Sequence, residues 1–222
     1  MKAYKIVDVV QGSEEWKALR LNHITASNVP VLFQQSPYKT PLQYFDELTT
    51  GVEREVTDRQ RALYDIGHKA EAAARKWVQN EIGIAMQPAV LISQACPDLL
   101  ASLDGFNPEK KTIFEAKYVG AEALREVKGG KVKAHHESQV QAQLLASGAD
   151  RCIYFALDPN GEAAVITIEP DLPYQKQIAD IEDQVSEYWK QVDDKKAQGA
   201  SVSSDIELLK AKIAQSELEI RS

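Results

Sequence analysis

The sequence has few of the features that mark exported, membrane-spanning or zinc-binding proteins. Its two cysteines, Cys96 and Cys152, lie far apart and match no zinc-ligand or redox spacing, so we expect two reduced thiols. No apolar run approaches the roughly 20 residues needed to span a bilayer, and the N-terminus has no apolar signal-peptide core. These absences lead us to expect a cytoplasmic protein without membrane contact.

The chain also lacks linkers, repeats and nucleotide-binding loops. Its 222 residues contain no repeat of fixed period and no Pro-rich or Gly/Ser-rich linker. We therefore expect a single domain over residues 1–200, followed at 201–222 by a C-terminal helix that packs on it or contacts a partner. The segment Lys128-Gly129-Gly130-Lys131 lacks the P-loop spacing and its Ser or Thr, so we expect no ATP requirement.

Positive charge is in the minority, but it is concentrated in one segment. Basic residues number 26 against 33 acidic ones, which gives a formal net charge of −7. Seven of the basic residues lie between Lys110 and Lys133, and two of them, Lys128 and Lys131, are candidates for binding DNA phosphates. A solvated loop is the simpler interpretation as long as the segment stands alone. The segment, called the basic patch below, consists of Lys110, Lys111, Lys117, Arg125, Lys128, Lys131 and Lys133.

Hydrophobic periodicity and turn residues predict helices, then a block of strands, then alternating helices and strands. The predicted helices cover about 13–21, 40–49, 57–82, 135–147, 172–197 and 204–219. The predicted strands cover about 4–10, 89–94, 99–103, 112–119, 151–157 and 163–169. This order is typical of an α+β fold, an α/β sandwich in which helices flank a central mixed sheet.

The residues that indicate chemistry are Asp104, Glu115 and Lys117. On a strand, Glu115 and Lys117 point to the same face, and a hairpin turn around Asn107 can return Asp104 beside them. Two buried carboxylates are costly unless a cation neutralises them, and Mg²⁺ prefers oxygen ligands. A solvated, salt-bridged hairpin is the alternative interpretation of these three residues.

Other candidates lie on predicted helices. Glu71 lies one turn after Gly67, a small residue that would allow a close backbone approach, so its carboxylate can face the sheet. Arg20 and Ser27 place a guanidinium and a hydroxyl near a helix start, where anions bind well. The adjacent His135 and His136 abut the basic patch; solvent exposure is the simpler interpretation and phosphate contact the alternative.

Taken in order, these residues form five motifs that resemble a known family. They resemble the phage λ exonuclease and YqaJ-type alkaline exonucleases, a branch of the PD-(D/E)xK nuclease superfamily. The resemblance spans most of the chain and implies a restriction-endonuclease-like core. Leu103 stands where proline is usual, which we expect to alter only a local turn. The motifs are W-x-x-x-R-x-x-x-I-T-A-S at 16–27, G-x-x-x-E at 67–71, S-x-D-G at 102–105, E-x-K at 115–117 and x-Q-V-Q at 138–141.

The resemblance implies a Mg²⁺-dependent deoxyribonuclease. Such an enzyme degrades double-stranded DNA processively from 5′ to 3′ and leaves 3′ single strands for annealing-type recombination. It implies two Mg²⁺ ions with Mn²⁺ as a substitute, a homotrimeric ring, and a single-strand annealing recombinase as partner. It also implies a bacterial or phage-encoded protein of the host cytoplasm. A ring would ease the charge problem, because three basic patches can line its channel.

The resemblance also implies roles for the residues at the metal. Asp104 and Glu115 would be metal ligands, aided by the backbone carbonyl of Ala116 and supported by Glu71. Lys117 would position the water molecule that attacks the phosphodiester.

The resemblance implies one more catalytic residue, on the helix predicted over 135–147, and three residues that bind the DNA. Gln139 and Gln141 lie two apart on a helix, so only one can face the site, and the resemblance favours Gln139. Arg20, Ser27 and Ser102 would hold the 5′-phosphate.

Two alternatives stay open on the sequence alone. One is a structure-specific or restriction-type endonuclease of the same superfamily. The other is a non-catalytic DNA-binding module that organises a recombination complex.

Overall fold

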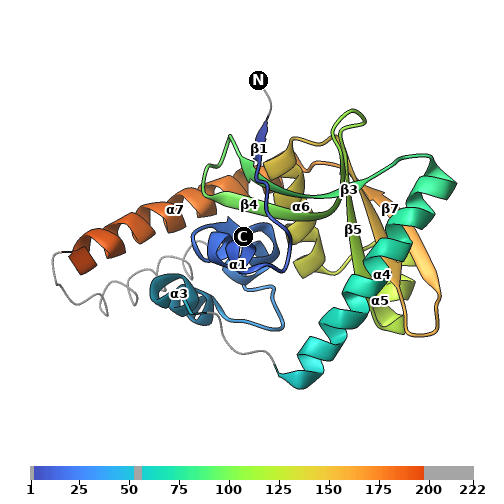
Figure 1. Ribbon diagram of the computed structural model, residues 1–222, viewed down its shortest axis with the longest axis horizontal. Helices are drawn as coiled ribbons and strands as arrows, with labels where there is room; N and C mark the ends of the chain where they lie inside the picture. The colour runs from blue at the N-terminus through green and yellow to red at the C-terminus, as the bar shows by residue number, and fades with distance from the viewer. Residues whose placement is uncertain (1–2, 53–56, 198–222) are drawn as a thin grey trace.

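A computed structural model of the chain describes residues 3–52 and 57–197 (Figure 1). A central sheet runs through the molecule in the order β1-β3-β4-β5-β6-β7, and the short β2 pairs with β4 beside this path. Only the β2–β4 and β5–β6 pairs are parallel, so the sheet is mixed, as predicted. The strands are β1 (Tyr4–Ile6), β2 (Ile24–Thr25), β3 (Gln87–Ser93), β4 (Leu99–Asn107), β5 (Thr112–Tyr118), β6 (Arg151–Leu157) and β7 (Ala163–Ile168).

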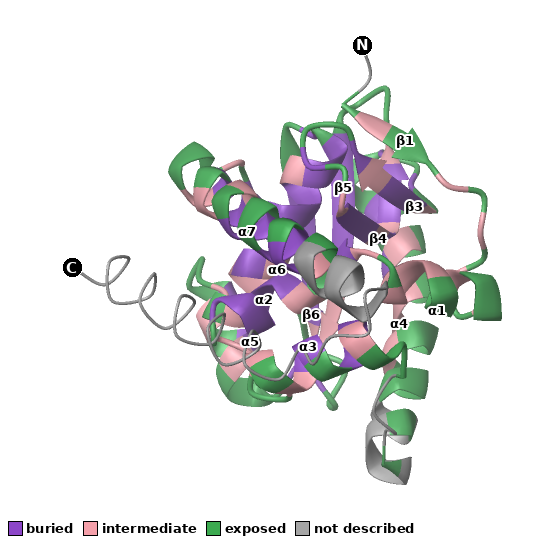
Figure 2. Ribbon diagram, turned by 90° about the vertical axis from the view of Figure 1, so that its left-hand side faces the viewer, coloured by how far each residue is buried: buried purple, intermediate pink, exposed green. Residues whose placement is uncertain are grey.

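Helices cover both faces of this sheet. On one face the buried helix α6 (Ala134–Ser147) packs on the strands, and α2 (Val29–Leu32), α3 (Pro41–Thr50) and α7 (Leu172–Ala197) complete the larger core (Figure 2). On the other face α4 (Asp58–Ile82) crosses the strands and closes a smaller core around Phe114 and Phe155 (Figure 1). The chain therefore has the predicted α+β architecture, with α6 and α4 on opposite sides of β5.

Capping residues begin and end the helices where the sequence predicts. Ser13 accepts a hydrogen bond from the backbone of Trp16 at the start of α1 (Glu14–Leu21). Thr40 and Gln43 form the predicted capping box of α3. Gly51 and Gly148 take left-handed backbone conformations directly after α3 and α6, where a side chain would be strained.

Several short elements differ from prediction. β1 ends at Ile6 rather than near residue 10, and β4 continues past Leu103 to Asn107. Leu103 is fully buried and pairs with Ala89, so it extends the strand instead of making a turn. Four elements were not predicted: β2, the 3₁₀ turn η1 (Ala26–Asn28), α2 and α5 (Ala121–Lys128). All four are 8 residues or shorter. The first three are too short for a clear hydrophobic period, whereas α5 lies in the charged segment that was interpreted as a solvated loop.

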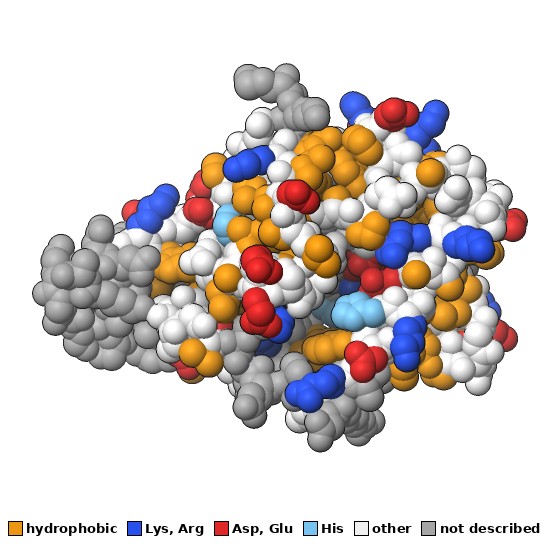
Figure 3. Space-filling view, viewed as in Figure 1, with side chains coloured by type: hydrophobic (Ala, Val, Ile, Leu, Met, Phe, Trp, Pro, Cys, Tyr) orange, Lys and Arg blue, Asp and Glu red, His pale blue; other side chains and the backbone are white. Residues whose placement is uncertain are grey.

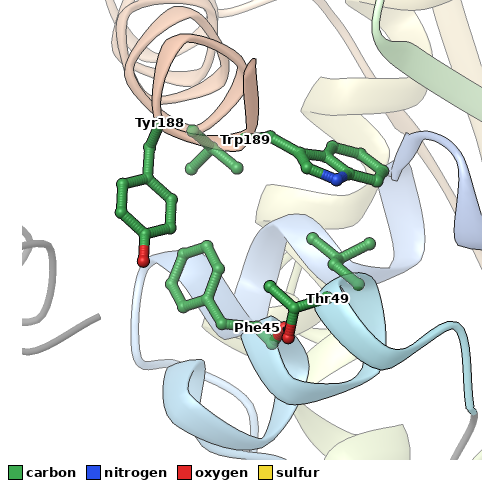
Figure 4. Close-up of a pocket in the computed structure, with 6 residues that line it drawn as sticks. Phe45, Thr49, Tyr188 and Trp189 are labelled. Atoms are coloured by element: carbon green, nitrogen blue, oxygen red, sulfur yellow. The ribbon is translucent and has the colours of Figure 1, made fainter. Parts of the chain in front are cut away.

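The last described helix packs as its apolar stripe predicts. Ile178, Ile181 and Val185 of α7 are buried in the larger core. Phe45 of α3 meets Tyr188 of α7 edge-on, with ring centroids 6.2 Å apart, beside a small apolar pocket (Figure 4). The helix predicted over residues 204–219 lies outside the described residues. Within the described part of the chain, no helix is both long enough and apolar enough to cross a membrane.

Candidate active site

The hairpin between β4 and β5 returns Asp104 to the side of Glu115, as the sequence predicts. Gly105 pairs with Phe114, and the next step of the ladder brings Oδ2 of Asp104 to 2.8 Å from the backbone nitrogen of Ala116. Gly105 is required by close packing, because a Cβ there would lie 2.9 Å from Cβ of Met86. The hairpin thus fixes the first carboxylate by a backbone hydrogen bond.

Glu115 is the most enclosed group of the site. Its side chain is only 2% exposed, and its Oε1 lies 2.5 Å from Nζ of Lys117. Gln139 of α6 donates a hydrogen bond of 2.6 Å to the same oxygen and accepts one of 3.1 Å from Lys117. Gln141 instead bonds to the backbone of Glu169, so Gln139 is the glutamine that faces the site.

Gln143 is a site residue that the motifs did not identify. Its Nε2 donates to Oε2 of Glu115 at 2.7 Å, while its own Oε1 is buried without a partner among the described residues. The signal was present in the sequence, because Gln139 and Gln143 are four residues apart on one helix face. Both carboxylate oxygens of Glu115 are therefore held by glutamines of α6.

Helix α4 supplies the opposite wall of the site. Glu71 is half-buried there and lies within electrostatic range of Glu115 and Lys117. One turn later, Arg75 donates a 2.7 Å hydrogen bond to the carbonyl of Asp104, a contact the sequence did not indicate. The close backbone approach expected at Gly67 is wrong for the described residues, because no atom of theirs outside the glycine's own helix turn lies within 4 Å of a Cβ built there.

Burial and mutual repulsion set the protonation of these acids. Burial, then the charges of Glu115 and Glu71, raise the pKa of Asp104 well above its usual range. Burial and Glu115 raise the pKa of Glu71 as well, although His68 opposes the shift. Burial alone would lower the pKa of Lys117, but the surrounding carboxylates outweigh it and raise the pKa. The positive charge near these three carboxylates is therefore too small for all of them to be ionised without a cost in folding free energy.

This donor set suits a hard divalent cation. Asp104, Glu115 and Glu71 offer carboxylate oxygens, and a bound cation would relieve the repulsion between them. Within the described ranges, no three acidic, histidine or cysteine groups already form a closed metal-binding cluster. Acidic side chains are recessed in a hollow beside α4, open to the surface (Figure 3).

A second group of side chains surrounds Trp16, and we call it the phosphate cluster: Trp16, Arg20, Ser27 and Ser102. The indole nitrogen of Trp16 donates a 2.8 Å hydrogen bond to Oγ of Ser102. The guanidinium of Arg20 lies over the Trp16 ring, 4.5 Å from its centroid, and both terminal nitrogens reach Oγ of Ser27 at 3.5 Å. The structure thus brings the three predicted phosphate ligands together, with Trp16 joining them.

The basic patch is not a single surface. Lys111 and Lys117 stand at opposite ends of β5, about 20 Å apart along an extended strand. Lys111 and Lys128 form exposed ion pairs with Asp150 and Glu162, at 3.5 and 2.6 Å. The prediction of a local patch is therefore wrong in its extent, because a count along the sequence ignores the length of the strand. Lys131 is exposed after α5, and a role for it or Lys128 in DNA binding stays a prediction.

The two histidines at the start of α6 differ from their predicted exposure. Nδ1 of His136 lies 2.6 Å from the Tyr154 hydroxyl, and the ring is only partly exposed. Burial and the charge of Lys117 lower the pKa of His136 to about 2, so its ring stays neutral. His135 is half-buried and contacts the ring of Tyr38.

A comparison with known protein families shows which family the chain belongs to. Residues 15–150 match the YqaJ-like viral recombinase domain, a span that includes all five motifs. The chain belongs to this family. No curated protein sequence matches it significantly.

Solved structures extend the YqaJ relationship to the whole fold. The alkaline exonuclease LHK-Exo from Laribacter hongkongensis matches with a TM-score of 0.64 and 25% identity, over 91% of this chain and 99% of its own. A phage-related exonuclease from Haemophilus somnus 129PT shares the fold at 12% identity, with a TM-score of 0.60 over 78% of this chain and 96% of its own. The chain is a nuclease of the YqaJ, alkaline-exonuclease type.

Proposed function

We propose that the chain is a Mg²⁺-dependent exonuclease that removes nucleotides processively from the 5′ ends of double-stranded DNA. The observation that carries this proposal is the position of Ser102 and Asp104 on β4. They are two residues apart, so their side chains share one face about 7 Å apart. This distance is comparable with one nucleotide step, so a 5′-phosphate held near Ser102 would place the next phosphodiester near Asp104.

The residues around the second phosphate have distinct proposed roles. Asp104 and Glu115, with the Ala116 carbonyl and support from Glu71, would hold two Mg²⁺ ions, and Mn²⁺ would substitute. When bound, the metal supplies stabilisation of charge on the phosphate and a lowered pKa of coordinated water. Lys117 orients the attacking water, and Gln139 holds Lys117 and Glu115 in place through hydrogen bonds of 3.1 and 2.6 Å.

The phosphate cluster would confer the polarity. A guanidinium and two hydroxyls match the oxygen atoms of a terminal phosphate, which carries more charge than an internal one. LHK-Exo has been solved in complex with dAMP, which supports a mononucleotide product for a nuclease of this type. The resulting 3′ single strand would pass to an annealing recombinase, in keeping with the viral recombinase description of the family.

A homotrimeric ring is part of this proposal. The net charge of −7 opposes DNA binding by a lone chain, whereas three chains can turn their basic side chains towards one channel. The salt dependence of activity tests this arrangement, and a nearly flat response would contradict a phosphate-lined channel.

Degradation of linear duplex DNA labelled separately at each 5′ and 3′ end tests the chemistry and the polarity. We expect shortening from the 5′-phosphorylated end with Mg²⁺, and none with EDTA or with Lys117→Ala. Lys176→Ala, at an exposed lysine of α7 outside the basic patch, is the matched control and should keep full activity. Absence of degradation under all conditions would favour a non-catalytic DNA-binding module.

Covalently closed circular duplex DNA separates the exonuclease from an endonuclease of the same superfamily. An enzyme that anchors a 5′ end leaves the circle intact, because the circle has no terminal phosphate for the phosphate cluster. Nicking of the circle at a rate close to that of linear degradation would overturn the end-dependent mechanism.

A further inference from the structure

Tyr38 is an exposed aromatic residue on an anchored loop. Its side chain is 76% exposed, although the backbone beneath it is fixed. Oγ of Ser36 accepts hydrogen bonds from the backbone nitrogens of Tyr38 and Lys39, at 3.2 and 3.3 Å. Lys39 in turn pairs with Glu47 of α3, whose side chain is 8% exposed. The fold thus holds the Tyr38 ring in solvent, where the ring adds little to the buried core.

The ring of Tyr38 contacts His135, which lies in line with the active site. His135, Gln139 and Gln143 follow one another at intervals of four residues, so they share one face of α6. The two glutamines bond to Glu115, and His135 stands one turn, about 5.4 Å, nearer the start of the helix. The Tyr38 and His135 rings meet edge-on with centroids 6.3 Å apart.

The surroundings of His135 suit a neutral planar ligand. Burial lowers the pKa of His135, and the charges of Lys117 and Lys133 lower it further, so the ring is uncharged near neutral pH. The exposed Tyr38 ring offers one flat apolar face, held edge-on by the uncharged imidazole of His135, and every nucleobase has a matching face. A base attached to a phosphate at Glu115 and Lys117 lies within about one helical turn of that surface.

We propose that Tyr38 and His135 form a stacking site for the nucleobase next to the scissile phosphate, in the strand being cut. This assignment rests on the proposed function and extends it to the base. Where the terminal bases leave their partners as the strand enters the site, an aromatic surface compensates for the lost stacking. The site accepts any base, since stacking does not read hydrogen-bonding edges.

Binding of 5′-phosphorylated duplexes that carry 2-aminopurine at the first, second or third base of the 5′ strand tests the site. EDTA is present throughout, so no strand is cut during the measurement. With the wild-type chain we expect a clear change in 2-aminopurine fluorescence at one of the three positions. Tyr38→Phe should keep that change, since the ring remains, whereas Tyr38→Leu and Tyr38→Ala should lose it and bind about tenfold more weakly.

The His135 side of the site has its own variant and control. His135→Phe should keep the fluorescence change and His135→Ala should reduce it. Ile82→Ala, at the exposed far end of α4, should leave it unaltered. Circular dichroism of each variant shows whether it folds.

The possible outcomes separate the two proposals. A wild-type chain that neither binds nor degrades DNA overturns the proposed function. A wild-type chain that degrades DNA, while Tyr38→Leu gives the same fluorescence change as wild type, overturns the stacking site alone.

Discussion

The carboxylate site and the phosphate cluster meet on β4, through Asp104 and Ser102, but are built differently. Glu115 is 2% exposed, and both its oxygens are occupied by hydrogen bonds from α6. Arg20 and Ser27, by contrast, meet at 3.5 Å near the surface, at the limit of a hydrogen bond. The first region is a rigid, enclosed arrangement of charges, and the second is open to a ligand that would complete it.

The difference shows what each region contributes to stability. Enclosing like charges costs folding free energy, as the raised pKa of Asp104 indicates, and such a cost persists where function requires it. The phosphate cluster lies nearer the surface, where solvent screens charge and a single substitution changes stability little. We therefore expect substitutions at the enclosed site to separate activity from stability, and substitutions at the phosphate cluster to alter only substrate preference.

The largest expected effect is that of Asp104→Asn. Activity should fall by about a thousandfold or more, because a carboxylate ligand is lost. The melting temperature in EDTA should rise by about 2–4 °C, equivalent to about 1 kcal/mol, because the cost of burying this charge and its repulsion from Glu115 and Glu71 disappear. Differential scanning fluorimetry measures the shift, and Asp150→Asn, an exposed acid, is the control. A fall in melting temperature would contradict the view of an electrostatically strained site.

The next effect concerns the glutamines of α6. Gln143→Leu removes the hydrogen bond to Oε2 of Glu115, so we expect kcat to fall by about 10- to 100-fold with little change in KM. Gln141→Leu is a matched control, because Gln141 is equally buried but bonds to Asp171 and Glu169. Steady-state kinetics compare the two. Equal losses of kcat would show that any buried glutamine of α6 affects activity through stability alone.

A smaller, more selective effect is expected from Arg20→Gln. The preference for 5′-phosphate over 5′-hydroxyl ends should fall by about tenfold, because the bidentate guanidinium is lost. Stability should change by less than about 0.5 kcal/mol. Competition between the two DNA ends measures the preference. Equal loss on both substrates would place Arg20 at a general DNA contact instead.

Glu182 of α7 is a buried acid outside the active site, so it shows the effect of burial on an acid without a catalytic role. It is 2% exposed and accepts a 3.0 Å hydrogen bond from the backbone of Asp98. Burial, opposed by that hydrogen bond and reinforced by Asp98 and Asp183, raises its pKa from 4.5 to about 7. The folded state therefore binds its proton more tightly than the unfolded state, and the penalty for ionisation grows as pH rises from about 4.5 to 7.

Glu182→Gln should remove this penalty. Its free energy of unfolding should match the wild-type value at pH 4 and exceed it at pH 8, on the order of 2 kcal/mol. Activity should be unchanged, since Glu182 contacts no site residue in the described part of the chain. Urea denaturation at a series of pH values measures the difference, and Asp180→Asn on the exposed side of α7 should show none. A pH-independent difference would mean that Glu182 is ionised throughout.

Much of the fold could be predicted from local patterns. The capping box at Thr40, the left-handed Gly148 and the apolar stripe of α7 each depend on residues close in sequence, and the structure confirms them. The strand pair around Asp104 and Glu115 was predictable for the same reason, because a hairpin joins neighbouring segments. The short α2 was missed because 4 residues carry no clear periodicity, and α5 was missed because its charged segment was interpreted as a solvated loop.

The sequence by itself determined which residues are brought together in the hairpin, their order and their chemical types. Only the tertiary structure decided that Gln143 and Arg75 join them, since both contacts span more than 25 residues of chain. It also dispersed the basic patch along β5 and brought Tyr38 to His135. Contacts between distant segments depend on how helices pack across a sheet. A hydrophobic pattern along the chain shows which face of a helix is buried, but not which element covers that face.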